Sequence, residues 1–187
     1  MNDREGPVVR SFFDEIYERY HQDLYQFVIY MVKDRDLAQD LVQEVYIKVM
    51  KSYQSFDGRS SEKTWLFSIA RHVTIDYFRK QKRKRKRVMD FFDWGERGEQ
   101  IQDHDSLPEE IAVQNEEMKE VFQALGKCTM DQKSVIILRF VQGMSIHETA
   151  EILNWSESKV KTTQHRGMKS LRDMLSSKDQ GGVQREA

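Results

Sequence analysis

The side chains best suited to binding chemistry lie between residues 145 and 171, where two short amphipathic segments flank Asn154-Trp155-Ser156. On the second segment Val160, Gly167 and Leu171 recur on one side, and polar or basic residues recur on the other. Lys and Arg donate hydrogen bonds to guanine edges and phosphates, and Ser and Thr add adaptable hydrogen bonds. The pattern predicts a helix-turn-helix, whose second helix enters the major groove of DNA. Its outward side chains are Ser158, Lys159, Thr162, His165, Arg166 and Lys169.

An amphipathic helical pair with a solvated basic face is the competing interpretation of this segment. In the helix-turn-helix interpretation, Ala150 lies where the two helices approach closely, and Leu153, Trp155 and Val160 hold them together. Asn154 occupies the turn position where glycine is usual, and Asn accepts the left-handed backbone that the turn requires.

A second set of chemically suited residues lies in Ser60–Arg87, where Trp65, Phe67, Tyr77 and Phe78 alternate with cations. Aromatic rings stack on unpaired bases and cations follow the backbone, so this combination favours binding of single-stranded nucleic acid. The alternative is that Trp65, Ile69, Val73 and Tyr77 form the inner stripe of a helix. The six consecutive cations 82–87 indicate only an attraction for polyanions.

Catalytic and metal-binding patterns are not legible in the sequence. It has no glycine-rich phosphate loop, its single cysteine is Cys128, and its five histidines lack ligand spacing. We therefore expect no enzyme activity, cofactor, metal or small-molecule substrate. The longest apolar run, Phe27–Val32, is too short to span a bilayer, and the polar N-terminus lacks a signal-peptide core. We expect a cytoplasmic protein.

Helical periodicity dominates the elements that must position these residues. Apolar residues recur every three or four positions over 11–32, from Asp34 or Asp36 to Tyr53, and from Ser60 or Ser61 through Arg87. The pattern fails over 89–106. Three capping boxes follow, at Ser106/Glu109, Thr129/Gln132 and Ser145/Glu148, and Gly143 is suited to end a helix near Val141. Ser156 caps a last helix to about Leu175. The expected fold is all-α, with two small helical domains joined by an acidic flexible linker.

The charge distribution agrees with this division. Residues 1–87 carry +5, residues 88–120 carry −9, and residues 121–187 carry +3. Basic blocks suit nucleic acid, whereas the acidic connector is repelled by it.

The segment Asp40–Tyr46 reads as an ordinary polar helix face on periodicity alone, with Leu41 and Val45 inward. However, three segments together resemble, in order and spacing, an extracytoplasmic-function (group 4) sigma factor of RNA polymerase. These segments are DLVQEVYIKV, TWLFSIARHVTIDYFRK and VIILRFVQGMSIHETAEILNWSESKVKTTQHRGMKSLR. The resemblance covers nearly the whole chain. Within the family the chain is most similar to the sigma-X type of Bacillus-like bacteria.

The resemblance implies a division into domains and a set of partners. Residues 8–87 would be the sigma-2 domain, 88–106 the acidic linker, 107–175 the sigma-4 helix-turn-helix domain and 176–187 a disordered tail. The partners would be core RNA polymerase, promoter DNA as duplex and as single-stranded non-template strand, and an anti-sigma factor, which in this family is often membrane-anchored. The linker would thread the polymerase channel that later holds RNA.

The resemblance also assigns roles to residues. Core polymerase would bind Asp40, Gln43, Glu44 and Lys48. The −10 element would be recognised and melted by Ser60, Ser61, Lys63, Trp65, Arg71, His72, Asp76, Arg79 and Lys80. The −35 element would be read by Ser158, Lys159, Lys161, Thr162, His165, Arg166 and Lys169. Family members often have Asn in place of His72 and Arg in place of Thr163, so the promoter sequence does not transfer by analogy.

Two other classes of protein fit parts of the sequence. A stand-alone helix-turn-helix repressor or activator accounts for 145–171 but leaves the aromatic helix and the Asp40–Tyr46 face without a role. An all-helical adaptor predicts no salt-dependent DNA binding in the presence of polymerase.

Overall fold

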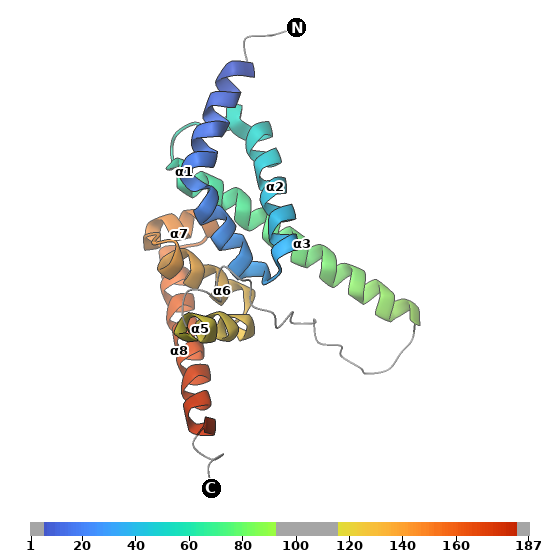
Figure 1. The fold of residues 1–187 in the computed structure, drawn as a ribbon, viewed down its shortest axis with the longest axis vertical. Coiled ribbons are helices and arrows are strands. Elements are labelled where there is room, and N and C mark those ends of the chain that lie inside the picture. Colours follow the sequence, from blue (N-terminus) through green and yellow to red (C-terminus); the bar gives the residue numbers. More distant parts are fainter. Residues whose placement is uncertain (1–5, 93–115, 183–187) are drawn as a thin grey trace.

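The computed structural model describes residues 6–92 and 116–182, and every regular element in these ranges is helical. Figure 1 shows an N-terminal unit in blue to green and a C-terminal unit in yellow to red. The N-terminal unit contains α1 (Gly6–Val32), α2 (Arg35–Ser52), the short 3-10 helix η1 (Tyr53–Ser55) and α3 (Glu62–Phe92). The C-terminal unit contains α5 (Glu116–Lys127), α6 (Met130–Ile136), the π-helical turn η2 (Ile137–Val141), α7 (Ile146–Leu153) and α8 (Glu157–Gly182).

A two-residue connection reverses the chain between α1 and α2. Lys33 adopts a left-handed backbone with φ of 62°. Asp34 then caps α2, since its carboxylate accepts a hydrogen bond from the Leu37 amide at 2.9 Å. Of the two caps that the sequence offered, Asp34 and Asp36, the helix uses Asp34. Leu41 and Val45 are buried between the helices, as the sequence predicts.

Helix α3 buries a wider set of residues than the predicted stripe, of which Val73 is buried as predicted. Leu66, Phe67 and Ala70 are fully buried, and Val73 is buried beside them. Trp65, Ile69 and Tyr77 are only partly buried. The reason is that α3 packs on α1 and α2 with one side and on α7 with another, so its buried surface is wider than one stripe. Beyond Arg87 the helix continues to Phe92, and its end projects away from both units (Figure 1).

The predicted caps of the C-terminal unit form as expected. Thr129 with Gln132 and Ser145 with Glu148 both make the reciprocal capping-box hydrogen bonds. Gly143 follows η2 with φ of 67° and therefore ends that helical segment where the sequence predicted. The capping box predicted at Ser106/Glu109 lies outside the described residues.

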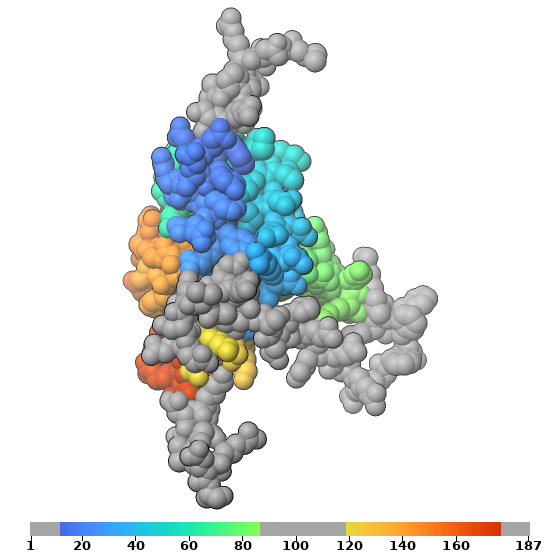
Figure 2. Space-filling model, viewed as in Figure 1, coloured from blue at the N-terminus to red at the C-terminus, as the bar shows by residue number. Residues whose placement is uncertain are grey.

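The two units pack against each other. Helix α3 contacts α7, and α1 contacts both α6 and η2. In the space-filling view the blue surface of α1 meets the orange surface of the C-terminal unit directly (Figure 2). Helix α8 continues to Gly182, beyond the predicted end near Leu175, so 176–182 is helical where a tail was expected.

Candidate nucleic-acid and polymerase interface

The predicted helix-turn-helix forms from α7, a tight turn and α8. Asn154 ends α7 in the left-handed conformation (φ 53°, ψ 50°), and its amide donates back to the carbonyl groups of the last turn. The hydroxyl of Ser156 accepts a hydrogen bond from the Lys159 amide at 3.3 Å and caps α8. Leu153 and Val160 are buried at the crossing of the two helices. The turn thus fixes the direction in which α8 leaves the unit.

The outward face of α8 carries all the residues predicted to read duplex DNA. Val160, Gly167 and Leu171 are buried, which places the opposite side of the helix in solvent. All seven residues proposed for the −35 element are exposed: Ser158, Lys159, Lys161, Thr162, His165, Arg166 and Lys169. The structure therefore brings this whole set together on one accessible surface.

Local contacts hold several of these side chains in place. The ammonium group of Lys159 lies 3.7 Å from the centre of the Trp155 ring, a close cation–π contact. Lys161 faces the Glu157 carboxylate at 3.9 Å, and the Thr162 hydroxyl donates to the Ser158 carbonyl at 3.0 Å. Such exposed contacts are weak, so they orient the side chains without preventing DNA contacts.

The start of α3 is held by hydrogen bonds from the preceding loop. Ser61 accepts a hydrogen bond from the Thr64 amide at 3.0 Å and its hydroxyl donates to the Thr64 hydroxyl at 2.9 Å. In the loop, Gly58 is left-handed, and Arg59 pairs with Asp57 at 2.9 Å. Ser60 is half-buried and Ser61 is exposed. The loop that holds the predicted −10 residues Ser60 and Ser61 is therefore built from ordered turns.

Trp65 lies next to this loop in a cluster of aromatic rings. Its ring centre is 4.9 Å from that of Phe56 and 6.3 Å from that of Phe12. Because the indole is half-buried, it combines a packing role with a surface available to a base. Phe67 has no such surface, because it is fully buried and packs edge-on against Phe27 at 5.4 Å. The prediction that Phe67 alternates with cations on a nucleic-acid surface is wrong.

Two of the predicted −10 contacts lie at the boundary between the units. Lys63 pairs with Asp23 at 2.8 Å and donates a hydrogen bond to the Gln142 carbonyl at 3.3 Å. Arg71 is half-buried, and its Nε has no hydrogen-bond partner among the described residues. Burial lowers the pKa of Arg71, while the Asp131 carboxylate of α6 acts in the opposite direction. Lys63 is thus engaged by both units, and Arg71 is partly withdrawn from solvent.

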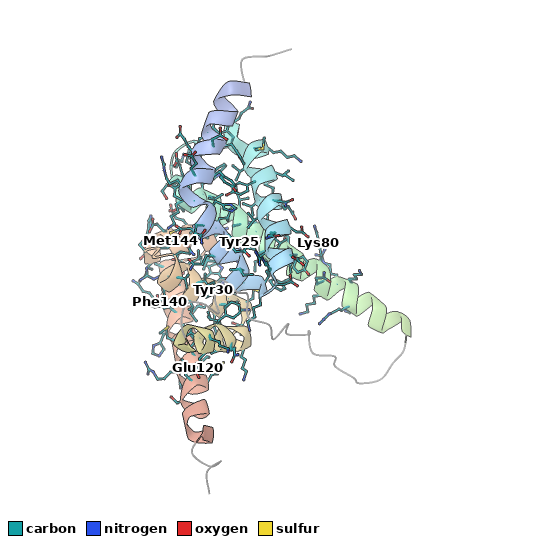
Figure 3. The ribbon with its side chains drawn as sticks, viewed as in Figure 1. Tyr25, Tyr30, Lys80, Glu120, Phe140 and Met144 are labelled. Carbon is teal, nitrogen blue, oxygen red and sulfur yellow. The ribbon has the colours of Figure 1, made fainter. Side chains whose placement is uncertain are left out.

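The remaining predicted −10 contacts follow α3 outward along its surface. His72 and the cations Arg79 and Lys80 are exposed, and Asp76 lies 3.8 Å from Arg79. Figure 3 labels Lys80 on the projecting part of this helix. Residues 82–86 are exposed on every side of the helix, and within the described part of the chain none of these five is paired with an acid.

The predicted polymerase-binding residues share one face of α2. Asp40 and Gln43 are exposed, and Glu44 and Lys48 are half-buried and paired with each other at 3.6 Å. Sequence reasoning missed the apolar neighbours Ile47 and Met50, which are 52% and 54% exposed. These two residues could be identified from the sequence only as apolar side chains of α2 that fall outside its buried stripe.

A cleft of roughly 370 Å³ adjoins this face between α1 and α2. His21 lies 3.1 Å from the Tyr46 hydroxyl and stacks on Tyr17, and burial raises the pKa of Tyr46. Gln43 belongs both to this cleft and to the predicted polymerase-binding set. The cleft is lined by Tyr17, His21, Tyr25, Gln39, Val42, Gln43 and Tyr46.

Comparison with known proteins accounts for both units. Residues 16–84 match the Sigma-70 region 2 family and residues 124–173 match the Sigma-70 region 4 family. The chain is 60% identical over 160 residues to the ECF RNA polymerase sigma factor SigX of Bacillus subtilis, covering 86% of this chain and 81% of SigX. The chain belongs to the ECF sigma factor family. It is an alternative sigma factor that recognises promoters. The RNA polymerase sigma factor YlaC of B. subtilis is 31% identical over 91% of this chain and 96% of its own.

Solved structures share the fold. The sigma factor RpoE of Bartonella quintana, in complex with the anti-sigma factor NepR, has a TM-score of 0.68 and 27% identity, covering 88% of this chain and 96% of its own. CnrH, in complex with the cytosolic domain of CnrY, has a TM-score of 0.65 at 21% identity, covering 90% of this chain and 90% of its own.

Within residues 6–92 and 116–182, no helix is long and apolar enough to cross a membrane. The same ranges contain no cluster of three or more His, Cys, Asp or Glu side chains placed to hold a metal ion.

Proposed function

We propose that this sigma factor reads the −35 promoter element as duplex through α8 and captures the −10 element as a separated strand through α3. The observation that carries the proposal is the outward face of α8. Its cations and hydroxyl groups lie together on the accessible side, while Val160 and Gly167 are buried on the other side. A helix presented in this way fits the major groove with its N-terminal residues at the base edges.

Reading of the −35 element is assigned to the seven residues of α8 named above. Arg166 and Lys169 suit guanine edges or phosphates, and Thr162 and His165 suit base edges. Each good bidentate contact to a base discriminates by about 1–3 kcal/mol. Contacts to phosphates position the helix without reading sequence.

Opening of the −10 element is assigned to the loop before α3 and to α3 itself. Trp65 would stack on an extruded base, which is worth roughly 1–3 kcal/mol. Arg79 and Lys80 would follow the phosphates, together with Lys63 and Arg71 once these leave the domain boundary. Melting would follow from differential affinity, because a protein that binds the open strand better than the duplex shifts the equilibrium toward the open form.

Docking on core RNA polymerase is assigned to Asp40, Gln43, Glu44 and Lys48 on α2. These residues lie on one accessible face, apart from the outward face of α8, so one chain can hold polymerase and DNA together. Domain boundaries of 8–87 and 107–175 contain the matched regions 16–84 and 124–173.

A cytoplasmic location and an anti-sigma partner complete the proposal. The location follows from the need to reach polymerase and DNA. The partner is supported by the likeness to RpoE, which was solved in complex with the anti-sigma factor NepR.

Run-off transcription with purified core polymerase over a genomic fragment library tests the proposal. Arg166→Glu should weaken use of −35-dependent promoters while leaving association with core polymerase intact. Arg172→Glu, on the same helix but at a different angular position, is the matched control and should transcribe like wild type. Glu44→Lys should weaken association with core polymerase, whereas Glu18→Lys on the exposed side of α1 should not.

The two rival functions give different results in the same experiments. A stand-alone repressor or activator binds duplex DNA tightly without polymerase in a gel-shift assay. An adaptor gives no salt-dependent DNA binding even with polymerase. Normal transcription by both Arg166→Glu and Glu44→Lys would show that the residue assignments are wrong.

A further inference from the structure

Helix α1 braces the start of α3 through two ion pairs of opposite direction. Arg19 on α1 pairs with Glu62, the first residue of α3, at 2.7 Å. Asp23 lies one turn further along α1 and pairs with Lys63 at 2.8 Å. Each helix therefore contributes one cation and one acid to the contact. The two pairs form a network, which is the arrangement in which surface ion pairs contribute measurably.

Tyr20 adds a neutral contact to the same carboxylate. Its hydroxyl lies 3.5 Å from Glu62 Oε2, the oxygen to which Arg19 also donates. The Arg19 guanidinium group in turn lies 5.7 Å from the centre of the Tyr20 ring. The Glu62 side chain is only 31% exposed, and its charge lies at the positive end of α3. Two neighbouring residues of α1 therefore fix the direction of this carboxylate.

Phe12 supports the connection before α3 from a position two turns earlier on α1. The centre of its ring lies 4.5 Å from that of Tyr53, 6.4 Å from that of Phe56 and 6.3 Å from that of Trp65. Figure 1 shows this connection beside α1. Helix α1 therefore holds the segment 53–65 with an aromatic ring and with charged side chains.

The braced segment is the one that the proposed function gives to the −10 strand. It contains Ser60, Ser61 and Trp65, whereas Glu62 is absent from the predicted −10 set. A binding group gains affinity when it is held in its bound geometry before the ligand arrives. An acid beside the path of a polyanion would also repel phosphates unless a cation neutralised it. Arg19 meets both requirements through the same contact.

We propose that Arg19 is a positioning residue for promoter opening. It acts through Glu62, holds the loop before α3 and Trp65 in the geometry that captures the −10 strand, and neutralises a carboxylate that would repel that strand. The proposal rests on the proposed −10 role of α3. It gives Arg19 no part in the −35 contacts of α8 or in the docking of α2 on polymerase.

A double-mutant cycle tests whether Arg19 acts through Glu62. Arg19→Met removes the guanidinium group but keeps an unbranched side chain, and Glu62→Gln removes the carboxylate charge but keeps the length. The cycle is completed by the double variant. Arg19→Lys keeps the positive charge and serves as the conservative rescue. Arg172→Met, at an exposed arginine of α8, is the matched control.

The measurement uses the full chain with core polymerase on a promoter carrying 2-aminopurine in the −10 non-template strand. The fluorescence of this base rises when it unstacks, so its time course gives the rate of opening. Initial binding is measured separately on a duplex that carries only the −35 element, and association with core polymerase is measured by anisotropy. A loss of general stability lowers all three quantities, whereas a positioning role changes only the rate of opening.

Arg19→Met should slow opening on the order of two- to five-fold, the range for an exposed ion pair. Initial binding and association with core polymerase should stay at the wild-type values. Arg19→Lys should retain most of the rate, Arg172→Met all of it, and Arg19→Met should have no further effect in the Glu62→Gln background. Circular dichroism checks that each variant is folded, and Arg19→Lys with Glu62→Gln keeps the test decisive if Arg19→Met is not.

Three results would overturn the positioning role. They are a wild-type rate of opening for Arg19→Met, an equal loss in the Glu62→Gln background, and a proportional fall in initial binding and core association. Arg79→Gln separates this failure from that of the proposed function. If Arg79→Gln slows opening and Arg19→Met does not, only the positioning role fails. If neither slows opening, the proposed −10 role of α3 fails with it.

Discussion

Gly167 lies where α8 crosses α6, and replacing it with alanine tests how tightly the recognition helix is held. A Cβ at this position would lie 2.8 Å from Ile136 Cδ1 and 3.3 Å from Gln132 Cβ. Ile136 is itself 4% exposed, so its side chain has little room to move away. Gly126 provides the contrast, since the atom nearest to a Cβ there is the end of the flexible Lys33 side chain.

Two effects of opposite sign decide the result. Alanine in a helix interior is favoured over glycine by about 0.8–1.0 kcal/mol. Overpacking a filled core costs about 1–3 kcal/mol. For Gly167→Ala the clash should win, and the free energy of unfolding should fall by about 1 kcal/mol, equivalent to roughly 4–8 °C in the midpoint of a domain of this size. For Gly126→Ala the helix preference should win, because Lys33 can swing aside.

Thermal denaturation of the full chain followed by far-ultraviolet circular dichroism measures both variants, and amide hydrogen exchange assigns the change to α6 and α8. Holoenzyme carrying Gly167→Ala should also bind −35 duplex more weakly, because the displaced helix carries Lys159 and Arg166. A Gly167→Ala variant as stable as Gly126→Ala, or more stable, would refute the close approach of the two helices.

Four further results are expected: two from the capping box of Ser145 and Glu148, one from the cations of α3 and one from its aromatic residues. Ser145→Ala should destabilise the C-terminal unit by about 1 kcal/mol through loss of the α7 cap, measured by urea denaturation. Hydrogen bonding to Ser145 lowers the pKa of Glu148 below its usual 4.5. The stabilisation that the Glu148 charge gives to the folded state is therefore present above pH 4.5 and disappears as the pH falls through the lowered pKa. Glu148→Gln should reduce this loss of unfolding free energy at acid pH, and an unchanged pH profile of stability would contradict the assignment. Changing Lys82, Lys84 and Lys86 to Gln should reduce the slope of log affinity against log salt for promoter DNA, by about 0.9 for each phosphate that the protein no longer neutralises; an unchanged slope would mean that this projecting segment does not touch DNA. Phe67→Ala should destabilise the N-terminal unit by about 3–5 kcal/mol. Trp65→Ala should reduce stability less than Phe67→Ala does, but it should reduce promoter opening more, and permanganate footprinting measures the opening.

Local chemistry explains which elements could be predicted from the sequence. The caps at Asp34, Thr129 and Ser145 depend on residues within three positions, and each forms as predicted. The helix-turn-helix is equally local, so its buried and exposed sides follow from periodicity. The α3 stripe differs from the prediction because a periodic pattern assumes one buried side, and α3 packs against neighbours on two sides.

Contacts between the units could not be predicted in the same way. Lys133 and Met31 are 102 positions apart, and Gln142 and Gln26 are 116 apart. Nothing in the sequence around Lys133 distinguishes it from an exposed lysine of an amphipathic helix. Its burial depends on the placement of a second folded unit, which is a property of the whole chain.

The close approach of Lys159 to the Trp155 ring gives the protein a built-in optical signal. Indole emission responds to a nearby ammonium group, and a phosphate that draws Lys159 away from the ring would change that emission. Trp65 lies in the other unit, within the segment assigned to the separated strand. The chain has a third tryptophan, Trp94. Replacing Trp94 and one of these two indoles with phenylalanine would leave the other indole to report on its own half of promoter binding, so the order in which duplex and single strand are engaged could be followed in time without attaching any dye.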